Sequence, residues 1–309
     1  MARGIGMTQQ VIGFVGFGEA AQCFATHLAG KGGPAPLVFC EGKTNRPPYS
    51  DAFQDMASAC GVELVDSLPA LMARADIVFS AVVVATAAPV GQAIAGLVRP
   101  GMLVVDVNAS TPRAKRLVGD AVTGSGGAFV DANLMGAVSI YGAAVPLYCS
   151  GDGAARFAEW FAPLGFTIEL AGPDAGTAAA VKMLRSVVTK GMEALIVEAL
   201  TAASLAGVRS EALRGICEPM DATRYSKFVD MCVRTDVLHA ERRAVEMDGV
   251  AEGLREIGLQ PIMTEATAAR LRTSARPGLG DDFAGRQAYS ADDVLDAYAA
   301  RMADLARDS

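Results

Sequence analysis

The chain has 309 residues, of which 51% are hydrophobic and 20% are charged, and its formal net charge is −7. This composition is typical of a globular protein with room for two domains, and it excludes a largely disordered chain. The acidic balance argues against nucleic acid as the main partner but is compatible with a local basic pocket for an anion. The apolar runs are too short to span a bilayer and the first ten residues carry no long apolar segment, so we expect neither a membrane partner nor a signal peptide.

The six cysteines are far apart and form neither a C-x-x-C pair nor a metal-like cluster with the two histidines. We therefore predict reduced, mostly buried thiols in a cytoplasmic protein without a metal site. The cysteines are Cys23, Cys40, Cys60, Cys149, Cys217 and Cys232.

Short apolar runs alternate with helical stretches from Val11 to about Leu170. Such alternation predicts an α/β fold, a Rossmann-type doubly wound sheet that is mostly parallel and has helices on both faces. The predicted strands are residues 11–15, 37–40, 62–65, 76–84, 102–107, 128–131, 145–150 and 166–170. The predicted helices between them include residues 20–29, 68–74, 90–97, 112–122 and 154–161.

A glycine turn directly follows the first predicted strand. Gly16, Gly18 and Ala21 have the G-x-G-x-x-A spacing, with an apolar strand before them and a helix after them. The first glycine permits a tight turn, the second lets the backbone approach a pyrophosphate, and the small alanine lets helix and strand pack closely. The pyrophosphate would then lie on free N–H groups at the helix N-terminus. The residues predicted to bind a dinucleotide are Gly16, Phe17, Gly18, Glu19, Ala20, Glu41, Val83, Val84 and Asn108.

The end of the second predicted strand bears on the choice between NAD and NADP. Glu41 lies some twenty residues after the glycine turn, where a carboxylate binds the ribose diol of NAD and repels a 2′-phosphate. Two alternatives stay open: Cys40 occupies that position, or the following residues hold the 2′-phosphate of NADP. The sequence slightly favours NAD. The residues that would hold the phosphate are Lys43, Thr44, Asn45 and Arg46.

The second half of the chain has a helical pattern throughout. A long helix is predicted over residues 177–206, followed by helices at 210–216, 236–257, 264–271 and 291–306. Ser290 is expected to cap the last of these, and residues 276–285 are expected to form a surface loop. We therefore predict a dinucleotide-binding domain over residues 8–172 and a helical domain for substrate binding and dimerisation over residues 173–309. One apolar stripe on the long helix contains Val181, Leu184, Val188, Met192, Leu195 and Ala199.

The opposite face of the long helix is polar. Lys182, Ser186, Thr189 and Glu193 fall along that face, and Arg185 and Lys190 border it. A solvated helix face is the simpler interpretation. Lys182, however, comes early in a helix that follows a glycine loop, and its neighbours are apolar. A lysine that is partly desolvated in this way can exchange protons near neutral pH.

These motifs together resemble the β-hydroxyacid dehydrogenase superfamily, which includes 3-hydroxyisobutyrate and 6-phosphogluconate dehydrogenases. The resemblance covers nearly the whole chain and involves four segments. Two of them depart from the family pattern: Asn133 replaces a proline, and Met135 a serine, while Ala178 takes the place of a glycine. The four segments are Gly16–Ala21, Asp106–Pro112, Asp131–Ala137 and Gly172–Lys182.

The resemblance implies a role for each segment. Lys182 would be the general acid or base, and Asn108 and Ser186 would position the reacting carbon, with Ser186 standing where family members usually carry asparagine. The substrate carboxylate would meet the backbone at Asn133, Met135, Gly136 and Ala137, near Arg185, in a cleft between the two domains. The resemblance also implies a homodimer, in a branch whose helical C-terminal domain is poorly characterised.

One further helix face carries charge. His239, Arg242, Arg243 and Glu246 fall at i, i+3, i+4 and i+7. They form either an exposed face with i,i+4 charge pairs or an anion pocket that completes the substrate site. The other histidine, His27, lies behind the glycine turn and is expected to be structural.

The sequence as a whole predicts an NAD(P)-dependent oxidoreductase that transfers a hydride between a small anionic hydroxy acid and the nicotinamide. Two alternatives remain. One is an imine reductase on the same scaffold, and the other is a protein that binds NAD(P) without turnover. The residues do not name the substrate.

Overall fold

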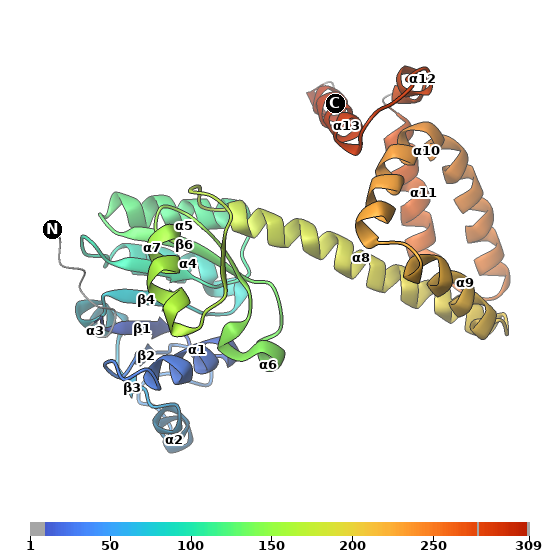
Figure 1. The fold of residues 1–309 in the computed structure, drawn as a ribbon. Helices are drawn as coiled ribbons and strands as arrows, with labels where there is room; N and C mark the ends of the chain where they lie inside the picture. The colour runs from blue at the N-terminus through green and yellow to red at the C-terminus, as the bar shows by residue number, and fades with distance from the viewer. Residues whose placement is uncertain (1–9, 277, 308–309) are drawn as a thin grey trace. The chain divides into compact units, whose positions relative to one another are not determined.

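The structure is a computed structural model that describes residues 10–276 and 278–307. It contains two compact units, one ending at Ser186 and the other beginning at Val187. The first unit is built on an eight-stranded sheet with the order β3-β2-β1-β4-β5-β6-β7-β8 (Figure 1). Strands β1 to β6 are parallel, β7 runs antiparallel to β6, and β8 is parallel to β7. The strands are β1 (Ile12–Val15), β2 (Leu37–Phe39), β3 (Glu63–Leu64), β4 (Ile77–Ser80), β5 (Leu103–Asp106), β6 (Ala128–Leu134), β7 (Leu147–Ser150) and β8 (Ile168–Leu170).

Helices cover both faces of this sheet, which confirms the predicted doubly wound architecture. Buried residues of α1, α2 and α7 pack on one face, and those of α3, α4 and α5 pack on the other. Alternate residues of each strand point to opposite faces, so Phe14 joins the first layer and Val15 the second. The helices are α1 (Glu19–Ala29), α2 (Asp51–Ala59), α3 (Leu68–Arg74), α4 (Val84–Ala95), α5 (Pro112–Gly124), α6 (Val138–Tyr141) and α7 (Ala154–Phe161).

All eight predicted strands exist, but two predictions in this unit need correction. The strand predicted over residues 76–84 ends at Ser80, because the Val82 N–H then donates to the Asn108 side chain rather than to a neighbouring strand. The apolar residues that follow begin α4 at Val84, well before the predicted start at residue 90. The short helices α2 and α6 were not predicted.

The long predicted helix is confirmed as α8 (Thr177–Leu205). Its first ten residues belong to the compact unit that contains the sheet, which ends at Ser186. The division into two functional domains near residue 173 stays a prediction. Its apolar stripe is exposed in the single chain, with Leu184 61% and Val188 48% accessible to solvent.

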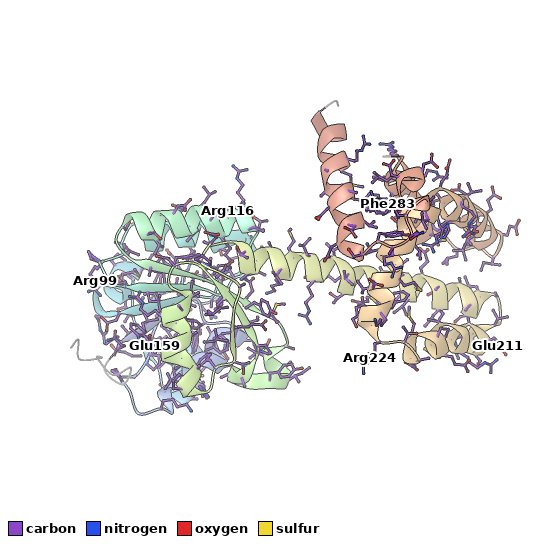
Figure 2. The ribbon with its side chains drawn as sticks, turned by 45° about the horizontal axis from the view of Figure 1, so that its top comes forward. Arg99, Arg116, Glu159, Glu211, Arg224 and Phe283 are labelled. Carbon is purple, nitrogen blue, oxygen red and sulfur yellow. The ribbon has the colours of Figure 1, made fainter. Side chains whose placement is uncertain are left out.

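The second unit is helical, as predicted. Helix α10 packs against α11, α12 and α13. Val237 of α10, Phe283 of α12 and Tyr298 of α13 belong to one buried cluster, in which Phe283 is labelled in Figure 2. Residues 276–285 were expected to be a surface loop, but they contain α12, whose Leu279 and Phe283 are buried. The loop prediction was wrong because this i,i+4 apolar pair outweighs the surrounding glycines. In the described part of the chain, every helix is too short or too polar to cross a membrane. The helices are α9 (Arg209–Asp221), α10 (Tyr225–Glu256), α11 (Ile262–Ala275), α12 (Leu279–Ala284) and α13 (Ala291–Arg307).

Candidate functional site

The glycine turn lies at the carboxyl end of β1. Gly16 has φ +91° and its N–H donates to Phe39 O at 2.8 Å. A Cβ at this position would stand 2.3 Å from Ala81 O, so a side chain is excluded both by space and by backbone conformation. The turn therefore requires glycine where the motif places it.

The N-terminus of α1 opens directly behind this turn. Gly18 is its N-cap residue, and no side chain caps the helix. A Cβ at Gly18 would meet no atom within 4 Å, so the space beside the helix end is open. Glu19 is exposed, Ala20 is half-buried, and Phe17 packs into the core. Uncapped N–H groups at a helix start, with open space in front, suit the pyrophosphate of a dinucleotide.

The residues after β2 separate into a buried and an exposed group. Burial raises the pKa of the Cys40 thiol to about 11, which keeps it neutral inside the core. Tyr49 links the backbone after β2 to the backbone after β3, because its hydroxyl accepts from Cys40 N and donates to Val65 O. Glu41 is exposed, and so it, not Cys40, presents a polar group to solvent at this strand end. Lys43, Thr44 and Arg46 are exposed as well.

Asn108 follows β5 and is almost completely buried. Its amide nitrogen donates to Ser80 Oγ at 2.9 Å and to Asp106 Oδ1 at 2.7 Å, and its oxygen accepts from Val82 N at 2.6 Å. The side chain thus ties together the turns after β4 and β5. Its contact with a nicotinamide stays a prediction. Val83 and Val84, on the β4 side, are 70% and 63% exposed.

A buried lysine that the sequence analysis missed joins β5 to β6. Lys115, on α5, has no solvent exposure. Its Nζ lies 3.1 Å from Asp106 Oδ1 and 3.2 Å from Asp131 Oδ1, and it donates to Asp106 O at 2.7 Å. Each aspartate follows three apolar residues of its strand. The two aspartates are register partners, so their side chains lie on the same face of the sheet. Buried charges of this kind persist only when they are paired and hydrogen-bonded.

Asp131 also holds the start of α8. Its Oδ2 accepts from Gly176 N at 3.1 Å and from Ala179 N at 3.0 Å. The Ser150 hydroxyl donates to the same oxygen and accepts from Ala178 N. The first amide groups of α8 are therefore occupied by protein oxygens, so this helix start offers no site for an anion. Gly176 has φ +92°, and a Cβ there would lie 2.6 Å from Pro112 O, which explains the glycine before the helix.

The predicted catalytic helix face begins one turn later. Lys182 and Ser186 are half-buried, and the Ser186 hydroxyl donates to Lys182 O at 3.0 Å. Arg185 is exposed and donates to Met135 O at 3.0 Å. This contact shows that the loop predicted to bind the substrate and the helix that carries Lys182 are next to each other within the first unit.

The predicted carboxylate loop differs from expectation at two residues. The Met135 N–H donates to Pro146 O at 2.8 Å, because the β6–β7 pairing continues to this point, so it is not available to a substrate carboxylate. Asn133 is buried, donates to Asp131 Oδ1 at 2.8 Å, and its own Oδ1 has no hydrogen-bond partner among the described residues. Gly136 and Ala137 are exposed, and their predicted role is untouched.

The helix face predicted to bind an anion lies in the second unit. Some of its residues are exposed there and others are half-buried. Arg242 forms an exposed pair with Glu246, which matches the interpretation as a solvated face. Arg243 donates to Thr235 Oγ1 at 3.0 Å, and both Arg243 and His239 are half-buried. His27, as predicted, is structural: its Nε2 lies 2.7 Å from Leu164 O.

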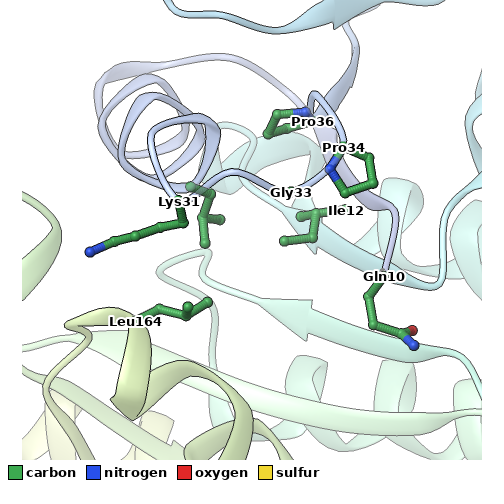
Figure 3. Close-up of a pocket in the computed structure, with 8 residues that line it drawn as sticks. Gln10, Ile12, Lys31, Gly33, Pro34, Pro36 and Leu164 are labelled. Atoms are coloured by element: carbon green, nitrogen blue, oxygen red, sulfur yellow. The ribbon is translucent and has the colours of Figure 1, made fainter. Parts of the chain in front are cut away.

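A small cavity in the first unit lies away from these groups. It measures about 30 Å³ and is lined by residues at the amino ends of β1 and β2, including Ile12, Pro34 and Pro36 (Figure 3). That volume holds roughly one water molecule, so the cavity is no substrate site. Among the described residues, no three His, Cys, Asp or Glu side chains are placed to hold a metal ion.

Comparison with known proteins supports the fold. The chain is 29% identical over 259 residues to an uncharacterised 28.5 kDa protein of Methanothermus fervidus, covering 83% of this chain and 95% of that protein. It is also 29% identical to a conserved protein of unknown function whose structure is described as similar to 3-hydroxyacid dehydrogenases. The TM-score is 0.59, and the match covers 85% of this chain and 97% of the other.

Two imine reductases share the fold at lower identity. One, from Aspergillus terreus in complex with NADPH4, is 18% identical with a TM-score of 0.69, over 88% of this chain and 95% of its own. The other, a variant from Myxococcus stipitatus in complex with NAD+, is 17% identical with a TM-score of 0.68, over 88% and 96%.

The protein therefore has the fold shared by NAD(P)-binding 3-hydroxyacid dehydrogenases and imine reductases, as the sequence motifs indicated. Residues 203–274 match the family described as a domain of unknown function (DUF1932), which places that domain in the helical unit.

Proposed function

We propose that the protein is an NAD(P)-dependent oxidoreductase that transfers a hydride between a carboxylate-bearing alcohol and the nicotinamide. The observation that carries this proposal is the uncapped N-terminus of α1 behind Gly16 and Gly18, at the carboxyl end of β1. In doubly wound sheets the ligand binds at this edge. The pyrophosphate would lie against α1, and the bound nicotinamide supplies the hydride acceptor.

Lys182 is the proposed proton acceptor. Oxidation of an alcohol requires a base for the hydroxyl proton, and an amine held on a half-buried helix face can take this role. Ser186, one turn further, would accept a hydrogen bond from the substrate, because its own proton is donated to Lys182 O. Gly136 and Ala137 would bind the carboxylate through their backbone N–H groups.

The proposal is tested by assaying the protein with NAD+ and NADP+ against sugar acids and aryl-bearing hydroxy acids, following the absorbance of the reduced nicotinamide. The matched variants are Lys182→Met and Lys190→Met, because both lysines lie on α8 and Lys190 is exposed. Turnover that is lost in the first variant and kept in the second supports the proposal. Equal turnover in both removes Lys182 from the acid–base role.

NAD is the cofactor that we favour. The exposed carboxylate of Glu41 follows β2, where we expect a residue that contacts the ribose diol in this fold, and it would repel a 2′-phosphate. The exposed side chains of Lys43, Thr44 and Arg46 support the opposite choice. Dissociation constants measured separately for the two dinucleotides decide between them.

Imine reduction is the second candidate function. Two observations favour it: the likeness of the fold to imine reductases, and Ser186 in the place where hydroxyacid dehydrogenases usually carry asparagine. NADPH oxidation with a cyclic imine, without any turnover of hydroxy acids, would select it. Dinucleotide binding without turnover of either class would indicate a non-catalytic protein.

We also propose that the active form is a homodimer. Along the apolar stripe of α8, Leu184, Val188 and Leu195 are 61%, 48% and 41% exposed, and a row of large apolar side chains on one helix is unusual for a monomer surface. Light scattering coupled to gel filtration should give a mass near 64 kDa, twice the chain mass of 31.9 kDa. A monomer at assay concentration would contradict this proposal.

A further inference from the structure

We propose that Asp131 and Lys115 are positioning residues that fix where α8 presents Lys182 to the substrate. The inference rests on the proposed function, because it assigns a purpose to the placement of that lysine. Neither residue touches a substrate or cofactor in this interpretation. They act through the helix that carries the amine.

The first step concerns the grip of Asp131 on α8. One carboxylate oxygen accepts two backbone N–H groups from the start of the helix, at Gly176 and Ala179. Lys182 lies three residues after Ala179, so it is on the same side of the helix less than one turn away. A small shift of Asp131 would therefore be passed to Lys182 with almost no intervening flexible chain.

The second step concerns the chemistry that the position demands. Every partner of Asp131 is a hydrogen-bond donor: the N–H groups and the Ser150 hydroxyl on Oδ2, and the Lys115 ammonium and Asn133 amide on Oδ1. An asparagine would present an NH2 group to donors whichever way it turned. Only a carboxylate satisfies both sides at once.

The third step concerns Lys115, which connects both halves of the candidate site. Its ammonium donates to Asp106 O, two residues before Asn108, and also lies against the Asp131 carboxylate. The loop predicted to lie by the nicotinamide and the helix that carries Lys182 are thus anchored on one buried charge. The distance between hydride acceptor and base would be set within the first unit by this pair.

A purely structural role is the competing explanation. The double variant that combines Lys115→Met with Asp131→Asn separates the two explanations. Lys115→Met leaves two buried carboxylates, and Asp131→Asn leaves one lysine with one carboxylate. The double variant leaves Asp106 alone, so the buried group keeps the net charge of −1 that it has in the wild type. It restores the charge balance without restoring the grip on α8.

The experiment compares four variants: Asp131→Asn, the double variant, Ser150→Ala as a milder change, and Asp152→Asn as a control. Asp152 is an exposed aspartate that accepts a backbone N–H from Phe129 at 2.8 Å, so it also holds a backbone amide, but its hydrogen bond goes to β6 and not to α8. The readouts are kcat and KM on the substrate identified in the assay, the dinucleotide Kd, and amide hydrogen exchange at Gly176, Ala178 and Ala179.

For a positioning role, we expect Asp131→Asn and the double variant to lose about 10- to 100-fold in kcat, with KM and dinucleotide Kd within about threefold of wild type. Exchange at the three amides should accelerate in both, by a smaller factor in Ser150→Ala, and stay unchanged in Asp152→Asn. A double variant with wild-type kcat overturns the proposal, and so does unchanged exchange at the start of α8.

Failure of the proposed function gives a different result. If the wild-type protein turns over neither hydroxy acids nor imines, the oxidoreductase proposal fails. Hydrogen exchange needs no substrate, so it still decides whether Asp131 holds the helix start.

Discussion

The starts of α1 and α8 lie in the same unit and carry the same backbone chemistry, yet they are treated in opposite ways. No side chain caps α1, and the space beside Gly18 is open. At α8, by contrast, Asp131 and Ser150 accept the first N–H groups. A helix N-terminus whose N–H groups are bonded to protein oxygens is held in place by the protein. An uncapped N-terminus leaves those N–H groups available to a negatively charged ligand. Four variants break or sharpen this contrast.

The largest effect is expected for Lys115→Met. It removes the buried ammonium between Asp106 and Asp131 and leaves both carboxylates without their cation. Breaking a buried pair in this way costs about 3–5 kcal/mol of unfolding free energy. Urea denaturation measures the loss. The exposed pair of Arg74 and Glu63 supplies the control, since Arg74→Met should cost no more than about 1 kcal/mol. A similar small loss in Lys115→Met would show that the buried ion pair contributes little.

Lys182→Met is expected to lower kcat by about 100-fold or more while dinucleotide binding survives, as for the loss of a general acid or base. The change removes the amine but keeps the contacts of Asp131 and Ser150 with the start of α8. It therefore separates the effect of the amine from the effect of the helix position. Steady-state kinetics and a binding titration give the two quantities. Near-normal kcat would contradict the role.

Gly18→Asp converts the open helix start into a filled one. The backbone at Gly18 has φ −79° and ψ −174°, and a Cβ meets no atom, so the side chain fits. A capping carboxylate should raise the free energy of unfolding by only about a few tenths of a kcal/mol, because glycine is itself a fair N-cap residue. It should also weaken dinucleotide binding by about tenfold or more, because it places negative charge where the pyrophosphate is expected. Thermal unfolding and a dinucleotide titration measure both. Higher stability with unchanged affinity would place the dinucleotide elsewhere.

The smallest effect is expected for Glu41→Arg, at the rim of the open site. Replacing the exposed carboxylate by a guanidinium should shift the ratio of the NADP to NAD dissociation constants by about tenfold toward NADP. A matched Glu169→Arg change on β8, where Glu169 accepts from the Tyr148 hydroxyl, should leave the ratio unchanged. Equal ratios in all three proteins would exclude a role for Glu41 in cofactor choice.

Most of the fold was predictable because the first unit repeats strong local signals. Apolar runs, most of them next to a glycine, predicted each of the eight strands, and the glycine turn predicted where β1 ends and α1 begins. The helices α2, α6 and α12 were missed because they have only 9, 4 and 6 residues, which is too short for a clear helical period in the sequence. Residues 279–284 fold as a helix through the burial of Leu279 and Phe283, which is tertiary information.

The candidate site was predicted only in part, since its supporting residues come from elements far apart in sequence. Lys115 was missed, although a signal existed. It lies three and seven residues before Val118 and Val122, on the buried stripe of α5. A charge on an apolar stripe predicts a buried partner. Asp106, the last residue of β5, and Asp131, in the middle of β6, were available as that partner, but only the sheet register shows that they lie side by side.

The groups that hold the start of α8, from Ser150 to Asp131 and Lys115, all precede Ser186 in the chain. Placement of the amine is therefore self-contained, and the helices beyond it are free to change in sequence or number without moving it. Relatives that keep the sheet and exchange the C-terminal module would then inherit one reaction centre and differ in what they admit to it.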